Sequence, residues 1–118
     1  MTNKKKFHIS DILSVTTGKL VSTRKMDGLY DILNFMTNDN LFTHQLPRAY
    51  KECKPYLLEQ IPALRNVTGK EVTEDNWKEW LEEQIEKFGE YFEIEPLPEG
   101  VHEYIDPITE AIEMMNKK

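Results

Sequence analysis

The length, composition and charge of this chain exclude several classes of protein. Its 118 residues suffice for one domain, 1–118, that folds without a disulfide or a structural metal ion. The single cysteine, Cys53, excludes an intramolecular disulfide and zinc sites built from several thiolates, and no apolar run is long enough to cross a membrane. We therefore expect a cytoplasmic protein that carries no cofactor.

The net charge of −6 conceals two halves of opposite sign. Residues 1–70 hold eleven Lys or Arg and six Asp or Glu, whereas residues 71–113 hold two and fifteen. These counts define a basic half of charge +5 and an acidic half of charge −13, and two lysines follow. Such an acidic segment repels nucleic acid and attracts basic partners, although solubility alone also explains it.

The first 40 residues predict two helices. A short helix over 10–17 begins at Ser10, which can cap its first turn, and ends at Gly18, which suits a left-handed stop. Apolar residues at helical spacing predict a second helix over 23–37. Residues 19–22 are predicted to form a connector or a short strand.

A third helix is predicted to begin near Pro47, because proline suits the first helical turn. Its apolar stripe comprises Tyr50, Cys53, Leu57 and Ile61. Pro55 interrupts this helix, and an interior proline costs about 3 kcal/mol, so we expect a kink or two short helices that meet near Lys54. Residues 65–72 are predicted to form a surface loop between the two halves.

The acidic half begins with a fourth predicted helix. Thr73 is its expected cap, and Gly89 follows its last apolar residue. The expected buried stripe comprises Trp77, Trp80, Leu81, Ile85 and Phe88. Phe92 and Ile94 alternate with glutamates, which predicts a short half-buried strand that can pair with the similar segment 5–10.

A last helix is predicted over 107–116, with Asp106 as its cap. It is expected to bury Ile108, Ala111, Ile112 and Met115. Together the predicted elements indicate an α+β fold, mainly helical, with four to five helices and a small two-stranded β element.

The fourth predicted helix carries carboxylates on one face, opposite its apolar stripe. They are Asp75, Glu79, Glu82, Glu83 and Glu86. Like charges at this spacing repel each other, which favours a basic partner that compensates them. The candidate partner-binding surface adds three glutamates of the following strand, Glu90, Glu93 and Glu95. The alternative is an ordinary solvated face.

A second candidate site lies in the segment THQLPRAYKEC. His44, Gln45 and Arg48 offer a base, a hydrogen-bond donor and an anion clamp, and Cys53 offers a thiol. This combination suits either a protein that binds a small ligand, for example a phosphorylated nucleotide, or an enzyme. The structural alternative makes Cys53 a core residue and Arg48 the anchor of its own loop.

Other classes of site are disfavoured. His8, His44 and His102 lie in different predicted elements without ligand spacing, so no metal site is expected. The acidity of the chain argues against direct binding of nucleic acid, whose affinity depends on neutralised phosphates. A homo-oligomer remains a third hypothesis, in which the basic half of one copy contacts the acidic half of another.

Under half of the chain resembles proteins of bacterial viruses. Residues 9–60, ISDILSVTTGKLVSTRKMDGLYDILNFMTNDNLFTHQLPRAYKECKPYLLEQ, resemble small uncharacterised proteins encoded by tailed bacteriophages and prophages. The resemblance implies a bacterial cytoplasm and an accessory role during infection, and it assigns no activity or catalytic residue. Small acidic phage proteins are often inhibitors of host machinery, including anti-CRISPR and anti-restriction proteins, and this chain is similar to them in size and charge.

The leading hypothesis combines these observations. We expect a phage-encoded accessory protein that acts by binding and not by catalysis. Its acidic surface would occupy a basic site on a host defence or nucleic-acid-processing complex, in the manner of an anti-CRISPR protein. No membrane association is expected.

Overall fold

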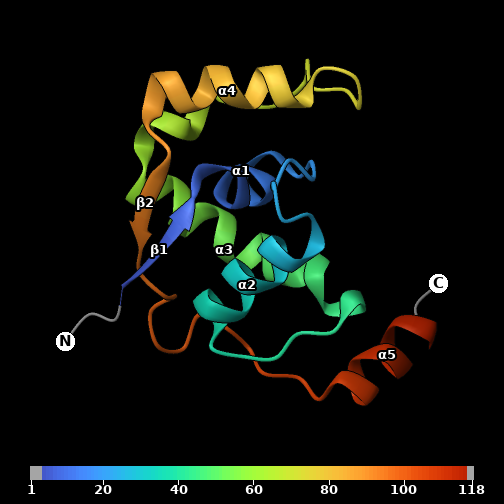
Figure 1. Cartoon of the computed structure of the whole chain (residues 1–118). Helices are drawn as coiled ribbons and strands as arrows, with labels where there is room; N and C mark the ends of the chain where they lie inside the picture. Colours follow the sequence, from blue (N-terminus) through green and yellow to red (C-terminus); the bar gives the residue numbers. More distant parts are fainter. Residues whose placement is uncertain (1–3, 117–118) are drawn as a thin grey trace.

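The computed structural model describes residues 4–116, which form five α-helices, two short 3-10 helices (η1 and η2) and a two-stranded sheet (Figure 1). In chain order the elements are β1 (Lys5–His8), α1 (Ile9–Thr17), α2 (Met26–Thr37), η1 (Thr43–Gln45), α3 (Leu46–Gln60), η2 (Pro62–Asn66), α4 (Trp77–Phe88), β2 (Tyr91–Ile94) and α5 (Pro107–Asn116). The predicted mainly helical α+β fold is confirmed. Among the described residues, no helix is both long and apolar enough to span a membrane.

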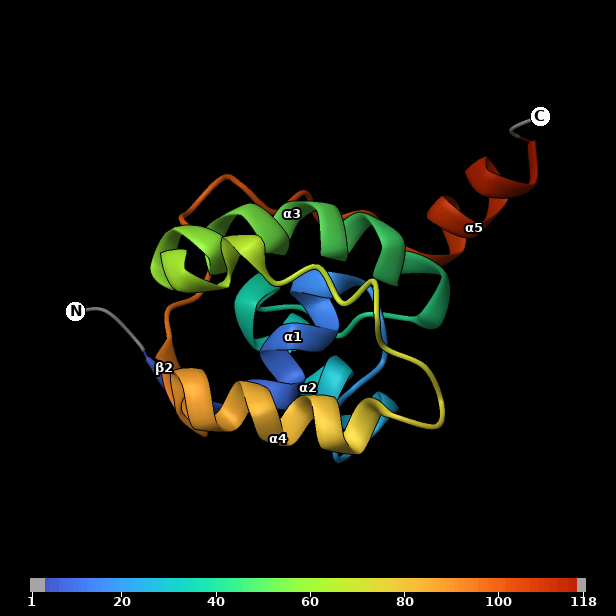
Figure 2. The same cartoon turned by 90° about the horizontal axis from the view of Figure 1, so that it is seen from above.

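Helix α1 is the centre of the structure. Every residue from Ile9 to Thr16 is buried, and Figure 2 shows α1 between α3 and α4. Helices α2 and α3 pack against it and against each other. Four polar residues of α1 are among those buried, and three of them, Ser10, Asp11 and Ser14, form hydrogen bonds that fix the neighbouring connector. For example, the Ser14 hydroxyl donates to Ser10 O and accepts from Val21 N, at 2.8 and 3.0 Å.

The first two helices begin differently from the prediction. The cap of α1 is His8 and not Ser10, because His8 Nδ1 accepts the Ser10 N–H at 3.1 Å. Gly18 closes α1 in the left-handed conformation, as predicted. Helix α2 starts at Met26, three residues later than predicted, because the residues before it form a turn that includes Lys25 at a φ of 56°.

Helix α3 continues without a break through Pro55, so the alternative of two short helices is wrong. Pro55 is exposed, whereas Cys53 and Leu57 on either side of it are fully buried. Their packing holds the helix together across the hydrogen bond that proline cannot donate. The helix begins at Leu46, one residue before the predicted start near Pro47 and directly after η1.

The sheet connects the acidic half to the basic half. Strands β1 and β2 are antiparallel, with Phe7 opposite Phe92 and Lys5 opposite Ile94, which confirms the predicted pairing. Phe7 and Ile94 are buried, so one face of this small sheet completes the core. Because β2 follows α4 after Gly89, the sheet also fixes the end of α4.

Helix α4 packs through Trp80 and Leu81 onto the core. It begins at Trp77, later than predicted, and Asp75 therefore lies in the preceding turn and not in the first helical turn. Thr73 Oγ1 accepts from Asp75 N at 3.3 Å and from Asn76 N at 3.2 Å. Thr73 thus caps this turn and not the helix itself.

Helix α5 projects from the body at the end of the molecule away from α4 (Figures 1 and 2). Its bounds agree with the prediction, and Asp106 Oδ2 accepts from Thr109 N at 3.1 Å, which makes Asp106 the predicted cap. The predicted burial of its apolar residues is wrong. Ile108, Ile112 and Met115 are exposed, and Glu110 is the buried residue of this helix.

Candidate functional site

Five carboxylates on and before α4 form an exposed acidic surface. These residues are Asp75, Glu79, Glu82, Glu83 and Glu86, and we call them the acidic surface. None of the five forms an ion pair within residues 4–116. Their charges are therefore left to solvent or to a partner.

The outward direction of these carboxylates follows from helix geometry. At about 100° per residue, the four glutamates of α4 lie opposite the inner face, where Trp80, Leu81 and Gln84 are buried. Lys78 and Lys87 flank the row, and Lys78 Nζ lies 5.6 Å from the centre of the Trp77 ring. Neither lysine pairs with a carboxylate among the described residues.

Two cations of the basic half, Lys5 and Arg24, neutralise carboxylates of the same half. Lys5 Nζ lies 2.8 Å from Asp31, and Arg24 bridges Asp31 and the buried Asp11 at 3.1 and 2.5 Å. The hydrogen bonds from Lys5 and Arg24 lower the pKa of Asp31 against the opposing effect of its burial. These cations are therefore not available to the acidic surface.

The strand after α4 extends the acidic surface less than the sequence suggested. The three residues concerned are Glu90, Glu93 and Glu95. Glu95 lies 3.8 Å from Lys4, and Glu90 lies 3.3 Å from His8 Nε2. Glu93 faces Lys6 across the sheet. Basic groups of β1 and of the preceding Lys4 thus accompany all three, and the unpaired charge is concentrated on α4 and the turn before it.

Arg48 of the second candidate site holds the C-terminal arm, which we define as residues 103–116. Its Nε and Nη2 donate to the two oxygens of Glu110 at 3.1 and 2.9 Å. Its Nη1 donates to Glu103 O at 2.5 Å and to Glu52 Oε2 at 3.2 Å. The guanidinium is therefore occupied by the chain itself, but it anchors the distant C-terminal arm and not its own loop, which was the structural alternative.

Gln45 and His44 hold the same arm. Gln45 Nε2 donates to Ile105 O and to Glu110 Oε1, both at 3.0 Å. His44 Nε2 lies 2.8 Å from Pro107 O, so this nitrogen carries a proton and donates it. The polar atoms that were expected to bind a ligand thus bind the arm.

Cys53 belongs to the core. Its side chain is fully buried, and burial, with a smaller contribution from the charge of Glu52, raises the pKa of its thiol to about 12. A thiol with this pKa is protonated at neutral pH and is a poor nucleophile.

A second attachment of the C-terminal segment, which sequence reasoning missed, is made by His102. Its Nδ1 lies 2.6 Å from Glu52 Oε1 and its Nε2 lies 2.9 Å from Asp39 Oδ2. Both ring nitrogens face carboxylates, so His102 attaches the segment before the arm to α3 and to the turn after α2. The partners are 50 and 63 residues away in sequence, and no local pattern indicates them.

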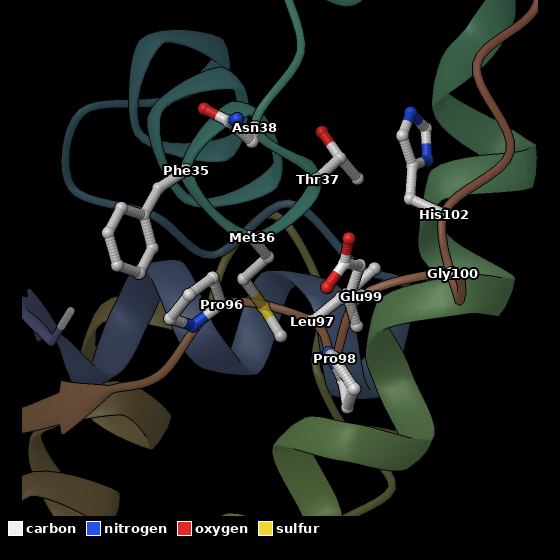
Figure 3. Close-up of a pocket in the computed structure, with 10 residues that line it drawn as sticks. All are labelled: Phe35, Met36, Thr37, Asn38, Pro96, Leu97, Pro98, Glu99, Gly100 and His102. Carbon is white, nitrogen blue, oxygen red and sulfur yellow. The ribbon is translucent and has the colours of Figure 1, made fainter. Parts of the chain in front are cut away.

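His102 stands at the edge of a cavity of about 450 Å³ between the end of α2 and the loop 96–100 (Figure 3). Apolar atoms of Met36, Leu97 and Pro98 contribute to its walls, and Leu97 N donates to Met36 O at 2.9 Å. The imidazole already contacts two carboxylates, so this cavity lacks a free histidine for a ligand.

Acid is expected to release the C-terminal arm. Hydrogen bonds from Arg48, and then from Gln45, hold the pKa of Glu110 below its ordinary value of 4.5. Ionised Glu110 therefore gives its full stabilisation of the docked arm at a pH above the ordinary pKa of 4.5. This stabilisation is lost as the pH falls through the lowered pKa. Hydrogen exchange at residues 103–116, measured from pH 6 to pH 3, should show the arm losing protection before α1. Equal loss in both segments would contradict this assignment.

Residues 7–67 match the model of a family described as a domain of unknown function, DUF7736. The matched segment contains α1, α2 and α3, which form the centre of the core, whereas α4, β2 and α5 lie outside it. No curated protein matches the chain, and no solved structure matches it.

Proposed function

The chain belongs to the DUF7736 family, and we propose that it is a binding protein whose acidic surface occupies a basic site on another protein. The observation that carries this proposal is the exposure of Asp75, Glu79, Glu82, Glu83 and Glu86 without an ion pair in the described part of the chain. Their mutual repulsion costs a few tenths of a kcal/mol per pair, and a basic partner removes that cost.

The spacing of the charges limits the kind of site that they fit. Glutamates one turn apart are separated by about 6 Å along the helix, whereas duplex DNA carries about one charge per 1.7 Å. One helix therefore matches a small cluster of Lys and Arg side chains and not a long duplex groove. The partner is expected to present a few basic groups, such as those that hold one or two phosphates.

The biological setting rests on the resemblance of residues 9–60 to small proteins of tailed phages and prophages. It supports a phage-encoded accessory protein of the bacterial cytoplasm. The acidic surface then suits an inhibitor of a host defence or nucleic-acid-processing complex, in the manner of an anti-CRISPR protein. No residue of the matched family segment is assigned a role in this inhibition.

A variant of four glutamates tests the proposal. Glu79, Glu82, Glu83 and Glu86 are replaced by Gln, which changes the net charge from −6 to −2 because each substitution removes one negative charge. In a pull-down from a bacterial lysate, the wild-type chain should capture a basic protein, and the variant should lose at least nine-tenths of this capture. Each exposed ion pair contributes about 0.2–1 kcal/mol, so the loss of four ion pairs with the partner accounts for a tenfold loss of capture.

The matched control removes the same number of charges elsewhere. Asp27 is replaced by Asn, and Glu59, Glu99 and Glu113 by Gln; all four are exposed and form no ion pair within residues 4–116. The control should capture the protein as well as the wild type does. Equal loss in both variants would assign the effect to net charge and overturn the proposed surface.

Duplex DNA distinguishes a nucleic-acid site from any other basic site. If the captured protein is bound through such a site, an added DNA duplex should release it from the immobilised chain in a concentration-dependent manner. Retention of the captured protein at saturating duplex would contradict the inhibitor proposal.

A further inference from the structure

The docking of the C-terminal arm has the geometry of peptide recognition. Three main-chain carbonyls of the arm, spaced two residues apart, accept hydrogen bonds from three side chains of the body. The donor and acceptor pairs are Arg48 Nη1 and Glu103 O (2.5 Å), Gln45 Nε2 and Ile105 O (3.0 Å), and His44 Nε2 and Pro107 O (2.8 Å). A spacing of two residues is that of an extended chain, whose groups alternate between opposite sides. The body therefore contacts one side of the main chain of residues 103–107.

The first residue of this segment is bound through both of its main-chain groups. Besides the carbonyl, the N–H of Glu103 contacts the body and donates to Glu52 Oε2 at 3.3 Å. The side chain of Glu103 is exposed, and that of Tyr104 is 68% exposed. Recognition of this part of the arm thus depends mainly on the main chain, as in other sites that bind extended peptides.

A glutamate supplies the contact that depends on sequence. The carboxylate of Glu110 accepts from Arg48 Nε and Nη2 and from Gln45 Nε2, at 3.1, 2.9 and 3.0 Å. The Glu110 side chain is only 9% exposed, so the three donors enclose a carboxylate that is almost fully removed from water. The planar fork of an arginine matches the two oxygens of a carboxylate. The body therefore selects an acidic residue at this position.

The body holds these donors in place without help from the arm. Gln45 is 1% exposed, and its Oε1 accepts from Phe42 N at 3.0 Å, which directs Nε2 toward the arm. Glu52 Oε2, one turn along α3, accepts from Arg48 Nη1 at 3.2 Å. A site whose donors are already oriented loses less conformational entropy when a peptide binds.

The arm is held by polar contacts and can be displaced. Three of its large apolar side chains, Ile108, Ile112 and Met115, are 72%, 53% and 81% exposed, so their burial contributes little to docking. On release, the hydrogen bonds of the arm are exchanged for hydrogen bonds to water, which limits the cost of opening. The arm thus occupies its site as a tethered ligand does.

We propose that η1 and the start of α3 form a peptide-binding site, which the C-terminal arm occupies as an autoinhibitory segment. The ligand is a segment of another protein whose main chain follows the path of residues 103–107 and whose glutamate takes the place of Glu110. The arm of a second copy is already bound to its own body and gains nothing from exchange. Helix α5 lies at the end of the molecule remote from α4 (Figures 1 and 2), so this inference does not depend on the proposed function.

Fluorescence polarisation with a labelled peptide of residues 103–114 tests the proposal. Glu110→Lys in the full chain places a like charge beside Arg48 and releases the arm. This variant should bind the peptide at least tenfold more tightly than the wild type, whose tethered arm competes with the peptide. Glu110→Gln removes only the charge and should give an intermediate affinity. Equal affinities of the wild type and Glu110→Lys would overturn the autoinhibitory role.

Further substitutions locate the site. Arg48→Ala, added to Glu110→Lys, should weaken peptide binding at least tenfold, whereas Lys51→Ala, at an exposed residue of the same helix, should leave it unchanged. In the peptide, Glu110→Gln should weaken binding similarly, and Tyr104→Ala should have no effect. Circular dichroism verifies that each variant is folded. Binding that survives Arg48→Ala, or that depends on Tyr104 more than on Glu110, would contradict the proposed site.

Sedimentation equilibrium distinguishes a segment of another protein from the arm of a second copy. The wild-type chain should stay monomeric at the concentrations of the binding assay, because each arm is bound to its own body. A dimer that excess peptide dissociates would assign the site to exchanged arms and overturn the proposed ligand.

Discussion

Replacement of Gly28 by alanine is expected to lower the free energy of unfolding by about 3 kcal/mol, the upper end for an overpacked core position. A Cβ atom at this position would overlap Asp11 Oδ1 and Ser22 Oγ. Both side chains are buried and short, and Ser22 Oγ donates a hydrogen bond to Asp11 Oδ1 at 2.5 Å. Asp11 also forms an ion pair with Arg24. The overlap can be relieved only by breaking this network or by moving α2 away from α1.

The sign of this effect is opposite to that given by helix propensity. Gly28 lies inside α2, where alanine would ordinarily stabilise the helix by about 1 kcal/mol. The steric overlap outweighs this gain. Urea denaturation of the variant should therefore show a lower midpoint, and Asp27→Ala, at the exposed neighbouring residue, should change stability by less than about 0.5 kcal/mol. An unchanged or higher midpoint for Gly28→Ala would contradict the close contact of α1 with α2.

Replacement of Arg48 by alanine is expected to release the C-terminal arm. The substitution leaves Glu110 buried without its cation, and an ion pair broken in this way costs about 3–5 kcal/mol. The arm can leave the body and expose Glu110 to water, which limits the cost and makes the result a local opening. Hydrogen exchange should then accelerate at least tenfold in residues 103–116 and stay unchanged in α1.

Two variants make this test specific to the geometry of Arg48. Arg48→Lys keeps the charge but loses the two parallel hydrogen bonds to Glu110. Hydrogen exchange in residues 103–116 should therefore be faster than in the wild type and slower than in Arg48→Ala. Lys51→Ala, at an exposed residue of the same helix, should exchange like the wild type. An arm that keeps its protection in Arg48→Ala would show that His44, Gln45 and His102 hold it without the ion pair.

The helices and the sheet were predictable because their signals are local. The spacing of Leu29, Leu33 and Met36 identifies α2, and the alternation of Phe92 and Ile94 identifies β2. The pairing of β2 with β1 was also predictable, since a half-buried strand requires a partner and few segments qualify. Glycine and proline positions indicated several of the element ends for the same local reason.

The orientation of α5 was not predictable, because it depends on a distant ion pair. Its apolar spacing is that of a helix with a buried stripe, and the sequence contains no indication that Glu110 pairs with Arg48, 62 residues before it. The attachment of His102 to Asp39 and Glu52 was unpredictable for the same reason. Local patterns thus predicted the elements, whereas long-range polar contacts decide how the C-terminal arm is attached.

The candidate site was predictable in part. The four glutamates of α4 follow from helical periodicity, because an amphipathic helix with buried Trp80 and Leu81 must direct them outward. The proximity of Glu90 and Glu95 to His8 and Lys4 was not predictable in detail, because it depends on the register of the sheet. The candidate ligand site was predicted incorrectly, because the polar atoms of His44, Gln45 and Arg48 hold the arm and are not free to bind a small ligand.

The dependence of partner binding on salt tests the central claim most directly. The affinity of the wild-type chain for its captured protein should fall steeply as the salt concentration rises from 50 to 500 mM, because screened carboxylates attract basic groups less. The variant with glutamine at positions 79, 82, 83 and 86 should bind weakly throughout, with a much flatter dependence. Identical salt dependence of the two proteins would mean that the carboxylates of α4 take no part in binding.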